Sequence, residues 1–427
     1  MKNLDSILRV TSDGSSTTFA SGEFQANSLA FDADGNLFAG LNAFTSDEAG
    51  VMKFTPDGTE TTFAFGPLLP SALAFEVPEI AQGRYDKIIV VIGENVGYEP
   101  LLDQNNCLYQ YAPYVHGALK NVALNYTDAH SSIHPSLPNY LRIFAGDNYC
   151  VDSDGCVCGT GGGTCGSGNG NDCQGAPETC SGGAHWSPIS QPTLHTRLKN
   201  DPAANNTDFV LYAEGLIDMN SGDYFACGNA DYAQKHNPAA FFAGSRTDEH
   251  CTGDVWKSFP KDSPPPAPQD LFALGRNGVA FIIPGQDHNG HDPGGACTHT
   301  ACGTPNNCNV ERVMAWNDWL ANNMPAYVAY ARDQANNTLL IITQDEESKD
   351  KDFIGGQVDP NHIMLFLIAG NLQPQTDAVK VGDPSNPSLA AQYNILRTIT
   401  KNFGVADLGN ATGPSIKVLI PPIQPPP

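Results

Sequence analysis

The chain has 427 residues and a formal net charge of −24, from 22 Lys and Arg against 46 Asp and Glu. So acidic a surface repels nucleic acid and anionic membranes, and neither is expected as a partner. The length favours one large domain or two unequal ones, and 41% hydrophobic residues are ample for a core. If the substrate is itself an anion, the site must supply local positive charge, and a metal ion is the obvious source.

The first 75 residues contain a repeat with an offset of 44 residues. VTSDGSSTTFASG (10–22) recurs as FTPDGTETTFAFG (54–66), with short alternating runs joined by Asp-Gly turns. Residues 1–80 resemble NHL-type propeller blades, whose period lies in the forties. Fewer than two blades are present, whereas a propeller needs about four or more. We therefore expect either the tail of a longer propeller or a β appendage.

After this segment the sequence predicts an α/β domain. Five apolar runs read as strands, and most do not alternate, as expected of strands buried on both faces. They are residues 87–92, 208–215, 278–283, 338–343 and 363–368, and a helical pattern covers 310–334. Strands alternating with helices predict a mostly parallel sheet flanked by helices. In such sheets ligands bind at the carboxyl ends of the strands.

Polar side chains follow three of these strands. Glu94 and Asn95 follow the first, and Asp345 and Glu346 follow the run at 338–343. The loop after 278–283 carries Asp287 and His291. Each alone reads as a helix cap or a solvated loop residue. Because a parallel sheet brings these ends to one rim, together they predict a site there.

One serine stands in an unusual frame, HPSLPNY at 134–140. Pro135 fixes its own φ, and Pro138 restrains Leu137 before it. The segment is therefore either a proline-bounded turn or a rigid frame for a nucleophile, Ser136.

These segments together resemble the phosphoesterase family of acid phosphatases and non-haemolytic phospholipases C. The matching pieces, in family order, are VVIGENVGYEPLL (90–102), HPSLPNYL (134–141), DYAQKHNPAAFF (231–242), FIIPGQDHNGHD (281–292), NDWLANNMP (317–325), IITQDEE (341–347), NHIMLFLIAG (361–370) and NILRTITKNFGV (394–405). HPSLPNY and KHNP are the most specific of them. The resemblance implies an alkaline-phosphatase-like fold over residues 85–416.

The resemblance also implies a metal site and a nucleophile. Glu94, Asn95, Asp345 and Glu346 would bind one divalent metal ion, with Ser136 as a further ligand. Ser136 would attack phosphorus to give a phosphoseryl intermediate, with its hydroxyl activated by the metal. An all-oxygen ligand set favours Ca²⁺, Mg²⁺ or Mn²⁺ over Zn²⁺.

The histidines of the motifs are assigned by the same resemblance. His291 is expected to be catalytic, because histidines of this family contact phosphate or protonate the leaving group. His134, His236, His362 and Asp287 are expected to contact substrate. For His134 and His236 the alternative is a structural hydrogen bond under a proline turn.

A second metal ion is the other possibility for part of this set. In two-metal relatives of the superfamily, an Asp-x-x-x-His pair and a distant His bind a second ion, here Asp287, His291 and His362. The family commonly has an Asp two residues before the His of the GHD piece, and this chain has Asn289. A single ion is therefore expected.

Three functions compete. The first is hydrolysis of small phosphate monoesters, and the second is a phosphodiesterase of phospholipase C type with the same nucleophile and metal. The third is an extracellular structural or adhesive protein with an inactive domain. The presence of all five metal-site residues argues against the third. Neither the natural substrate nor the oligomeric state follows from the sequence.

Cysteine content bears on location. Five of the 12 cysteines lie between Cys156 and Cys180, in a Cys/Gly-rich insertion at 150–183. Disulfides are favoured over a metal cluster because no histidine interleaves and the spacing fits no zinc pattern. They imply an oxidising compartment, so the protein is expected to be secreted, extracellular or periplasmic. No signal peptide opens the sequence, so the given start is expected to be internal. No run reaches the ~18 apolar residues of a membrane span, and 417–427 reads as a proline-rich tail.

Overall fold

A computed structural model describes most of the chain. The described residues are 5–10, 16–22, 25–31, 37–42, 50–55, 59–65, 85–149, 151, 154, 189–204, 207–216, 232–245, 255–293, 295–349 and 361–419. They divide into two compact units, Met1–Glu79 and Ile80–Pro427. The six cysteines of the predicted insertion at 150–183 and most of the predicted tail lie outside the described residues.

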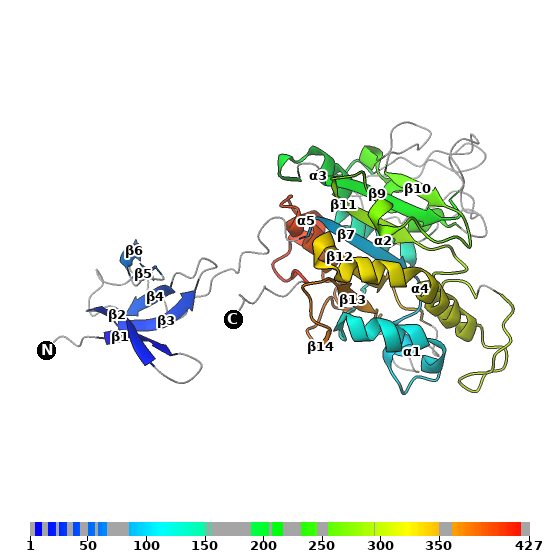
Figure 1. Ribbon diagram of the computed structural model, residues 1–427, viewed down its shortest axis with the longest axis horizontal. Coiled ribbons are helices and arrows are strands. Elements are labelled where there is room, and N and C mark those ends of the chain that lie inside the picture. The colour runs from blue at the N-terminus through cyan, green and yellow to red at the C-terminus, as the bar shows by residue number, and fades with distance from the viewer. Residues whose placement is uncertain are drawn as a thin grey trace. The chain divides into compact units, whose positions relative to one another are not determined.

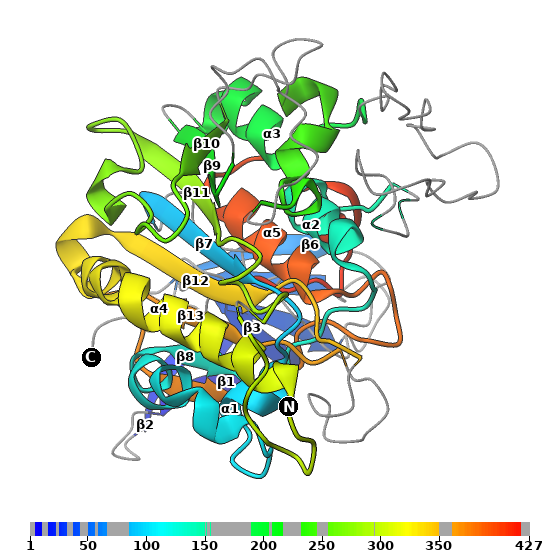
Figure 2. The same cartoon turned by 90° about the vertical axis from the view of Figure 1, so that its right-hand side faces the viewer.

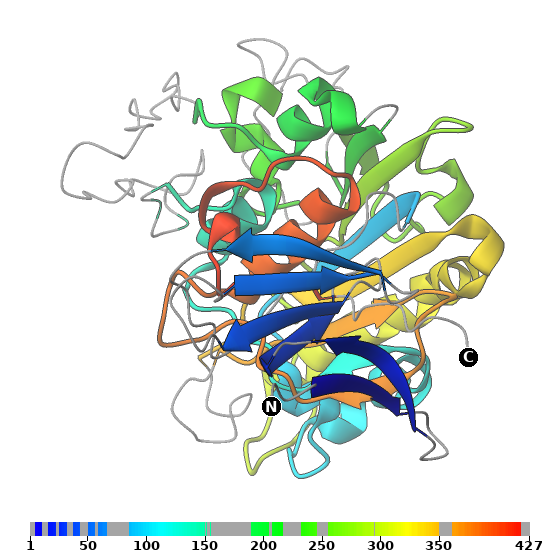
Figure 3. The same ribbon diagram turned by 90° about the vertical axis from the view of Figure 1, so that its left-hand side faces the viewer.

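The N-terminal unit consists of antiparallel strands, the blue arrows of Figure 3. β1 (Asp5–Val10) pairs with β2 (Ser16–Gly22), and a four-stranded sheet follows in chain order. Its strands are β3 (Gln25–Phe31), β4 (Leu37–Asn42), β5 (Gly50–Phe54) and β6 (Glu60–Phe65). The 44-residue offset of the repeat carries the β1–β2 hairpin onto β5 and β6. The repeat thus corresponds to a repeated hairpin, and the assignment to propeller blades stays a prediction.

The second unit is built on an eight-stranded sheet in the order β10-β9-β11-β7-β12-β13-β8-β14 (Figure 1). The strands are β7 (Lys87–Gly93), β8 (Leu124–Tyr126), β9 (Thr207–Glu214), β10 (Trp256–Phe259), β11 (Asn277–Ile283), β12 (Thr338–Gln344), β13 (Leu365–Ile368) and β14 (Gln375–Asp377). Only the two pairs that β13 makes, with β12 and with β8, are antiparallel. The predicted α/β class with a mostly parallel sheet is confirmed.

Helices cover both faces of this sheet (Figure 2). One core contains Ile88, Val90 and Ile92 and packs under α2 (Ser136–Ala145), α3 (Leu194–Asn200) and α5 (Ala391–Asn402). The other contains Ile89 and Val91 and packs under α1 (Tyr98–Leu102) and α4 (Cys308–Arg332). Because successive strand residues point to opposite faces, strands covered on both sides need continuous apolar runs. This explains why most of the five runs do not alternate.

Disulfides pair four of the cysteines within the described residues. Cys107 bonds Cys302, and Cys297 bonds Cys308 at the start of α4. The prediction of disulfide pairing is confirmed for these four.

Among the described helices, none has the length and apolar character needed to cross a bilayer.

A buried glutamate fixes the loop that follows β11. Glu214, at the end of β9, is 1% exposed. Its Oε2 accepts the N–H of Gly285 at 2.9 Å. Its Oε1 accepts the N–H of Asp262 at 3.0 Å and contacts His288 Nδ1 at 2.8 Å. The loop at 284–292, which carries the predicted residues Asp287 and His291, is therefore held at the carboxyl edge of the sheet.

We predict that replacing His288 with asparagine lowers stability more at pH 6 than at pH 8.5. The hydrogen bond to Glu214 raises the pKa of His288 above 6.5, against the effect of burial and with help from Asp262 and Asp287. The stabilisation is therefore complete below pH 6.5 and is lost as pH rises through the folded pKa. We expect a loss of about 1–2 kcal/mol at pH 6 by urea unfolding, allowing for partial solvent screening.

The matched control is His116→Asn, because burial and Lys120 lower the pKa of His116 instead. This variant should show no extra loss at the lower pH. If His288→Asn lowered the free energy of unfolding equally at both pH values, stabilisation by the charged form of His288 would be contradicted.

Candidate active site

Ser136 is the first residue of α2 and lies between two carboxylates. The predicted proline-framed segment is the start of a helix, with Pro135 at the N-cap. Ser136 is 1% exposed, and its hydroxyl donates to Glu94 Oε2 at 2.9 Å, with Glu346 Oε1 at 3.4 Å. The amino end of a helix favours anions through its free N–H groups and its dipole. The Ser136 hydroxyl therefore lies where a bound anion would be favoured.

The loop after β7 places Glu94 and Asn95 beside the loop after β12. The N–H of Glu94 donates to the carbonyl of Asn289 at 2.8 Å, and the carbonyl of Asn95 accepts the N–H of Ser348 at the same distance. Asn95 has a left-handed φ of 56°, which asparagine tolerates better than most residues. The sheet rim predicted from the sequence therefore joins these loops, as expected for the carboxyl ends of neighbouring parallel strands.

Asp345 and Glu346 lie at the start of the loop after β12. The N–H of Asp345 donates to the carbonyl of Gly93 at 3.1 Å. Glu346 Oε2 contacts His134 Nδ1 at 2.8 Å and accepts from the side-chain amide of Asn139 at 3.3 Å. Asp345 is 3% exposed, yet neither of its carboxylate oxygens has a hydrogen-bond partner within the described residues. A buried carboxylate without partners carries a large desolvation cost.

The electrostatics of this carboxylate group follow from that crowding. Burial, together with the charges of Glu94 and Glu346, raises the pKa of Asp345 well above its usual range. Burial likewise raises the pKa of Glu346, although His134 opposes it. The site therefore holds more negative charge than its own side chains compensate.

Glu94 differs because basic side chains surround it. Burial alone would raise its pKa, but His236, Lys235 and His291 lower it to about 2. His236 Nε2 lies 3.0 Å from Glu94 Oε1, but the two are not aligned, and both atoms lack a hydrogen bond in the described part of the chain. Glu94 is thus ionised at every physiological pH, with Oε2 on the serine and Oε1 beside His236.

These residues fit a hard divalent cation. The unpartnered oxygens belong to Asp345 and Glu94, and they are buried carboxylate oxygens of the kind that Mg²⁺, Ca²⁺ and Mn²⁺ prefer. Within the residues that the structure describes, no three His, Cys, Asp or Glu side chains already surround one point closely enough to hold a metal. Two carboxylates, Glu94 and Glu346, face the serine hydroxyl instead.

His291 also lies beside this group. Its N–H donates to Asn289 Oδ1 at 2.8 Å, and its Nδ1 contacts Asp292 Oδ1 at 2.9 Å. Its Nε2 is 3.1 Å from Lys235 Nζ, and its ring centroid is 5.9 Å from that of His236. Asn289 stands where the resembled family commonly has Asp. It accepts hydrogen bonds from the N–H groups of both Glu94 and His291.

Two predicted residues, Asp287 and His362, make their contacts elsewhere. Asp287 pairs with Lys261 at 2.7 Å and lines a cavity of about 740 Å³. His362 contacts Glu99 through Nδ1 at 2.8 Å and the carbonyl of Thr127 through Nε2 at 3.1 Å. Their proposed contacts with substrate stay predictions.

Three residues at the site were missed in the sequence: Lys235, Asp154 and Asn139. Lys235 precedes His236 in the KHNP motif, and Asn139 lies one helical turn after Ser136 in HPSLPNY. Both were within quoted motifs, and the helical spacing could have flagged Asn139. Nothing local flags Asp154, since its partner Lys235 is 81 residues away.

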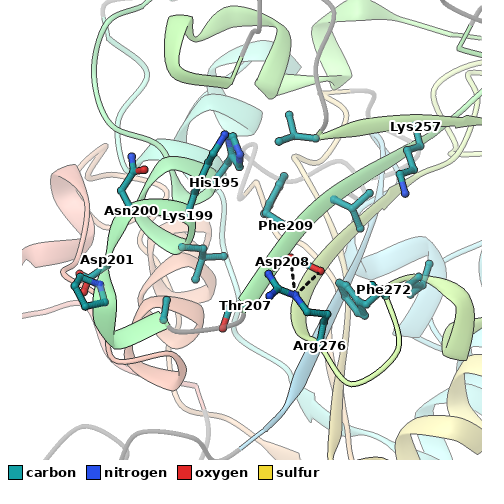
Figure 4. A pocket seen from close by; sticks show the side chains of 17 residues that line it. His195, Lys199, Asn200, Asp201, Thr207, Asp208, Phe209, Lys257, Phe272 and Arg276 are labelled. Atoms are coloured by element: carbon teal, nitrogen blue, oxygen red, sulfur yellow. Dashed lines mark hydrogen bonds and ion pairs between the residues drawn. The ribbon is translucent and has the colours of Figure 1, made fainter.

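A second cavity lies at the opposite edge of the sheet. It has a volume of about 610 Å³ and is lined by residues at the starts of β9 and β11 (Figure 4). In it, Arg276 forms an ion pair with Asp208 at 2.5 Å. Because Ser136 lies with the carboxyl ends of the strands, this cavity is separate from the candidate site.

No known protein-family profile matches the chain. Over 325 residues it is 24% identical to the phosphatidylinositol-3-phosphatase of Mycobacterium tuberculosis (strain ATCC 25618 / H37Rv), which covers 76% of this chain and 79% of the relative.

Solved structures of similar fold include a protein in the alkaline phosphatase superfamily from Vibrio parahaemolyticus, at a TM-score of 0.43 and 12% identity, covering 79% of this chain and 72% of that one. The periplasmic domain of EptC from Escherichia coli, in complex with zinc, matches with a TM-score of 0.45 and 10% identity, covering 82% and 90%. Both scores lie below 0.5, so neither likeness bears on what this chain does.

Proposed function

We propose that this protein is a metal-dependent phosphoric monoester hydrolase with Ser136 as its nucleophile. The observation that carries the proposal is the position of the Ser136 hydroxyl. It lies at the amino end of α2, between Glu94 and Glu346, beside a buried Asp345 whose oxygens have no partners in the described chain. A serine, a set of oxygen ligands and a helix terminus are what phosphoryl transfer through a phosphoserine needs.

One divalent ion would be held by Glu94, Asn95, Ser136, Asp345 and Glu346. When bound, such an ion lowers the pKa of a serine hydroxyl and neutralises charge on the phosphate. The oxygen donors favour Ca²⁺, Mg²⁺ or Mn²⁺ over Zn²⁺.

The protein's own residues orient the reaction. Glu94 Oε2 accepts the hydroxyl proton of Ser136 in a hydrogen bond and so directs a lone pair of Oγ outward. His134 and Asn139 hold Glu346 in place. As Oγ forms a bond to phosphorus, its proton passes to Glu94, the ester P–O bond breaks and the leaving alkoxide takes a proton from water. The general-acid role of His291 stays a prediction, because its Nε2 faces the ammonium group of Lys235. Water then cleaves the phosphoserine and releases phosphate.

The sequence relative supports the choice of reaction. The mycobacterial protein is named as a phosphatase and aligns with most of this chain, which favours monoester over diester hydrolysis. The motifs further support membership of the phosphoesterase family within the alkaline-phosphatase-like superfamily. The two disulfides support an oxidising, extracellular or periplasmic setting.

Substitution of Ser136 by alanine is expected to abolish turnover. We predict at least a 10³-fold loss of kcat with p-nitrophenyl phosphate, because no other group forms the covalent intermediate. Initial rates with Ca²⁺, Mg²⁺ or Mn²⁺ added measure this, and the exposed Ser385→Ala is the control. The bis ester, assayed in parallel, detects phosphodiesterase activity.

Each outcome of these assays decides between functions. Faster turnover of the bis ester would favour the phospholipase C alternative. No turnover of either ester with any metal would favour the inactive, structural alternative. Unchanged turnover in Ser136→Ala would remove that serine from the mechanism.

Substitution of Asp345 by asparagine is expected to stabilise the metal-free protein while removing its response to metal. The change removes a buried carboxyl group whose ionised form repels Glu94 and Glu346, so the Tm in EDTA should rise. Wild-type protein should gain several degrees on adding the activating ion, and the variant should gain little, because ligand binding to the native state stabilises it. Differential scanning calorimetry measures both. A variant less stable than wild type in EDTA would refute the account of Asp345 as an uncompensated charge.

A further inference from the structure

Lys235 is a buried lysine at this site to which the mechanism above gives no role. Its side chain is 13% exposed, and its Nζ lies 2.8 Å from Asp154 Oδ2 and 3.1 Å from His291 Nε2. The other oxygen of Asp154 accepts the N–H of Leu137, the residue after Ser136, at 3.0 Å. The ammonium group is therefore tied through one carboxylate to the first turn of the helix that carries the nucleophile.

The contact with His291 fixes the state of that ring. An ammonium group has only N–H donors, so His291 Nε2 must be the acceptor. The ring proton is then on Nδ1, which donates to Asp292 Oδ1 at 2.9 Å. His291 thus presents the lone pair of Nε2 to a cation, as a metal-binding histidine does.

The residues that would bind a second metal ion in a two-metal site make other contacts. Asp287 pairs with Lys261, and His362 pairs with Glu99. Of the three, His291 contacts Lys235 through Nε2, and Asp154 ties Lys235 to the N–H of Leu137, next to Ser136. The chain itself supplies a positive charge where the two-metal pattern would use an ion.

The surroundings keep Lys235 charged and leave part of it available. Burial would lower its pKa, but Glu94, Asp154 and Asp345 raise it. Of its three N–H donors, one serves Asp154 and one serves His291. Counting only partners within the described residues, one donor remains, on a fixed cation among the side chains that would bind metal and phosphate.

We propose that Lys235 binds the phosphoryl group of the substrate and takes the place of a second metal ion. The remaining N–H would donate to a phosphoryl oxygen, whose charge grows as the ester bond breaks. Asp154 and His291 are positioning residues for the ammonium group. This proposal rests on the proposed phosphatase function.

The test compares Lys235→Met, Lys235→Gln and Lys235→Arg with wild type. The control is Lys401→Met, which removes a partly buried lysine paired with Asp407 at 3.1 Å, outside the site. Titration calorimetry gives the Kd for inorganic phosphate in the presence of the activating metal, and the Kd and stoichiometry for that metal alone. Initial rates with p-nitrophenyl phosphate give kcat and KM.

Both uncharged variants should bind phosphate at least tenfold more weakly and lose at least 100-fold in kcat/KM. Their affinity for the metal should be unchanged or higher, because a positive charge near the carboxylates has gone. Wild type should bind one ion per chain, Lys235→Arg should retain part of the phosphate affinity, and Lys401→Met should stay within twofold of wild type.

Phosphate affinity within twofold of wild type in either folded uncharged variant would overturn the role of Lys235. Two ions bound per wild-type chain would overturn the replacement of a second metal. If wild type and the uncharged variants all bind metal and hydrolyse the ester equally well, the phosphatase function stands and only the proposal for Lys235 is overturned. Wild type that neither binds phosphate nor hydrolyses the ester would overturn both.

Discussion

The site depends on the electrostatic cost of keeping three carboxylates close together and out of water. Glu94, Asp345 and Glu346 are each less than 5% exposed, and the charges of the two glutamates help to raise the pKa of Asp345. The free energy of unfolding of a domain is only about 5–15 kcal/mol, so a buried carboxylate group persists only if the rest of the fold offsets its cost. Here the two hydrophobic cores on the faces of the parallel sheet supply that stabilisation, and a bound cation would relieve the repulsion.

The parallel sheet makes this crowding possible. β7 lies between β11 and β12, all three run in one direction, and their carboxyl ends present three loops at one rim. Gly93 shows how tight the arrangement is, since a Cβ there would lie 2.7 Å from the ring of Trp316. Backbone hydrogen bonds then join Glu94 to Asn289 and Asn95 to Ser348, so each loop is braced by its neighbours. The backbone at the ends of the strands, fixed by these hydrogen bonds, therefore determines where the carboxylates lie.

The central strands of the sheet and the residues that follow them could be predicted because they depend on local sequence patterns. Unbroken apolar runs predicted the strands, and the residues directly after them, Glu94 and Asp345, meet as the topology requires. Direction within a loop is not local, and there the prediction stopped. Asp287 and His291 share one loop, yet Asp287 turns to Lys261 and His291 to Lys235. The ion pair of Asp154 with Lys235 spans 81 residues and depends on the final packing, so no spacing rule reveals it.

The charge of the whole chain sets the remaining problem for an enzyme acting on phosphate. A net charge of −24 repels an anion at long range, and salt screens this over a Debye length of about 8–10 Å. Binding must therefore be gained at short range, from positive charge held inside the site. His236 is neutral at neutral pH because burial lowers its pKa, and His291 presents a lone pair, so neither provides that charge. The ammonium group of Lys235 and a bound metal ion would then supply this positive charge together. Their short-range attraction for a phosphate group would offset the long-range repulsion by the acidic surface.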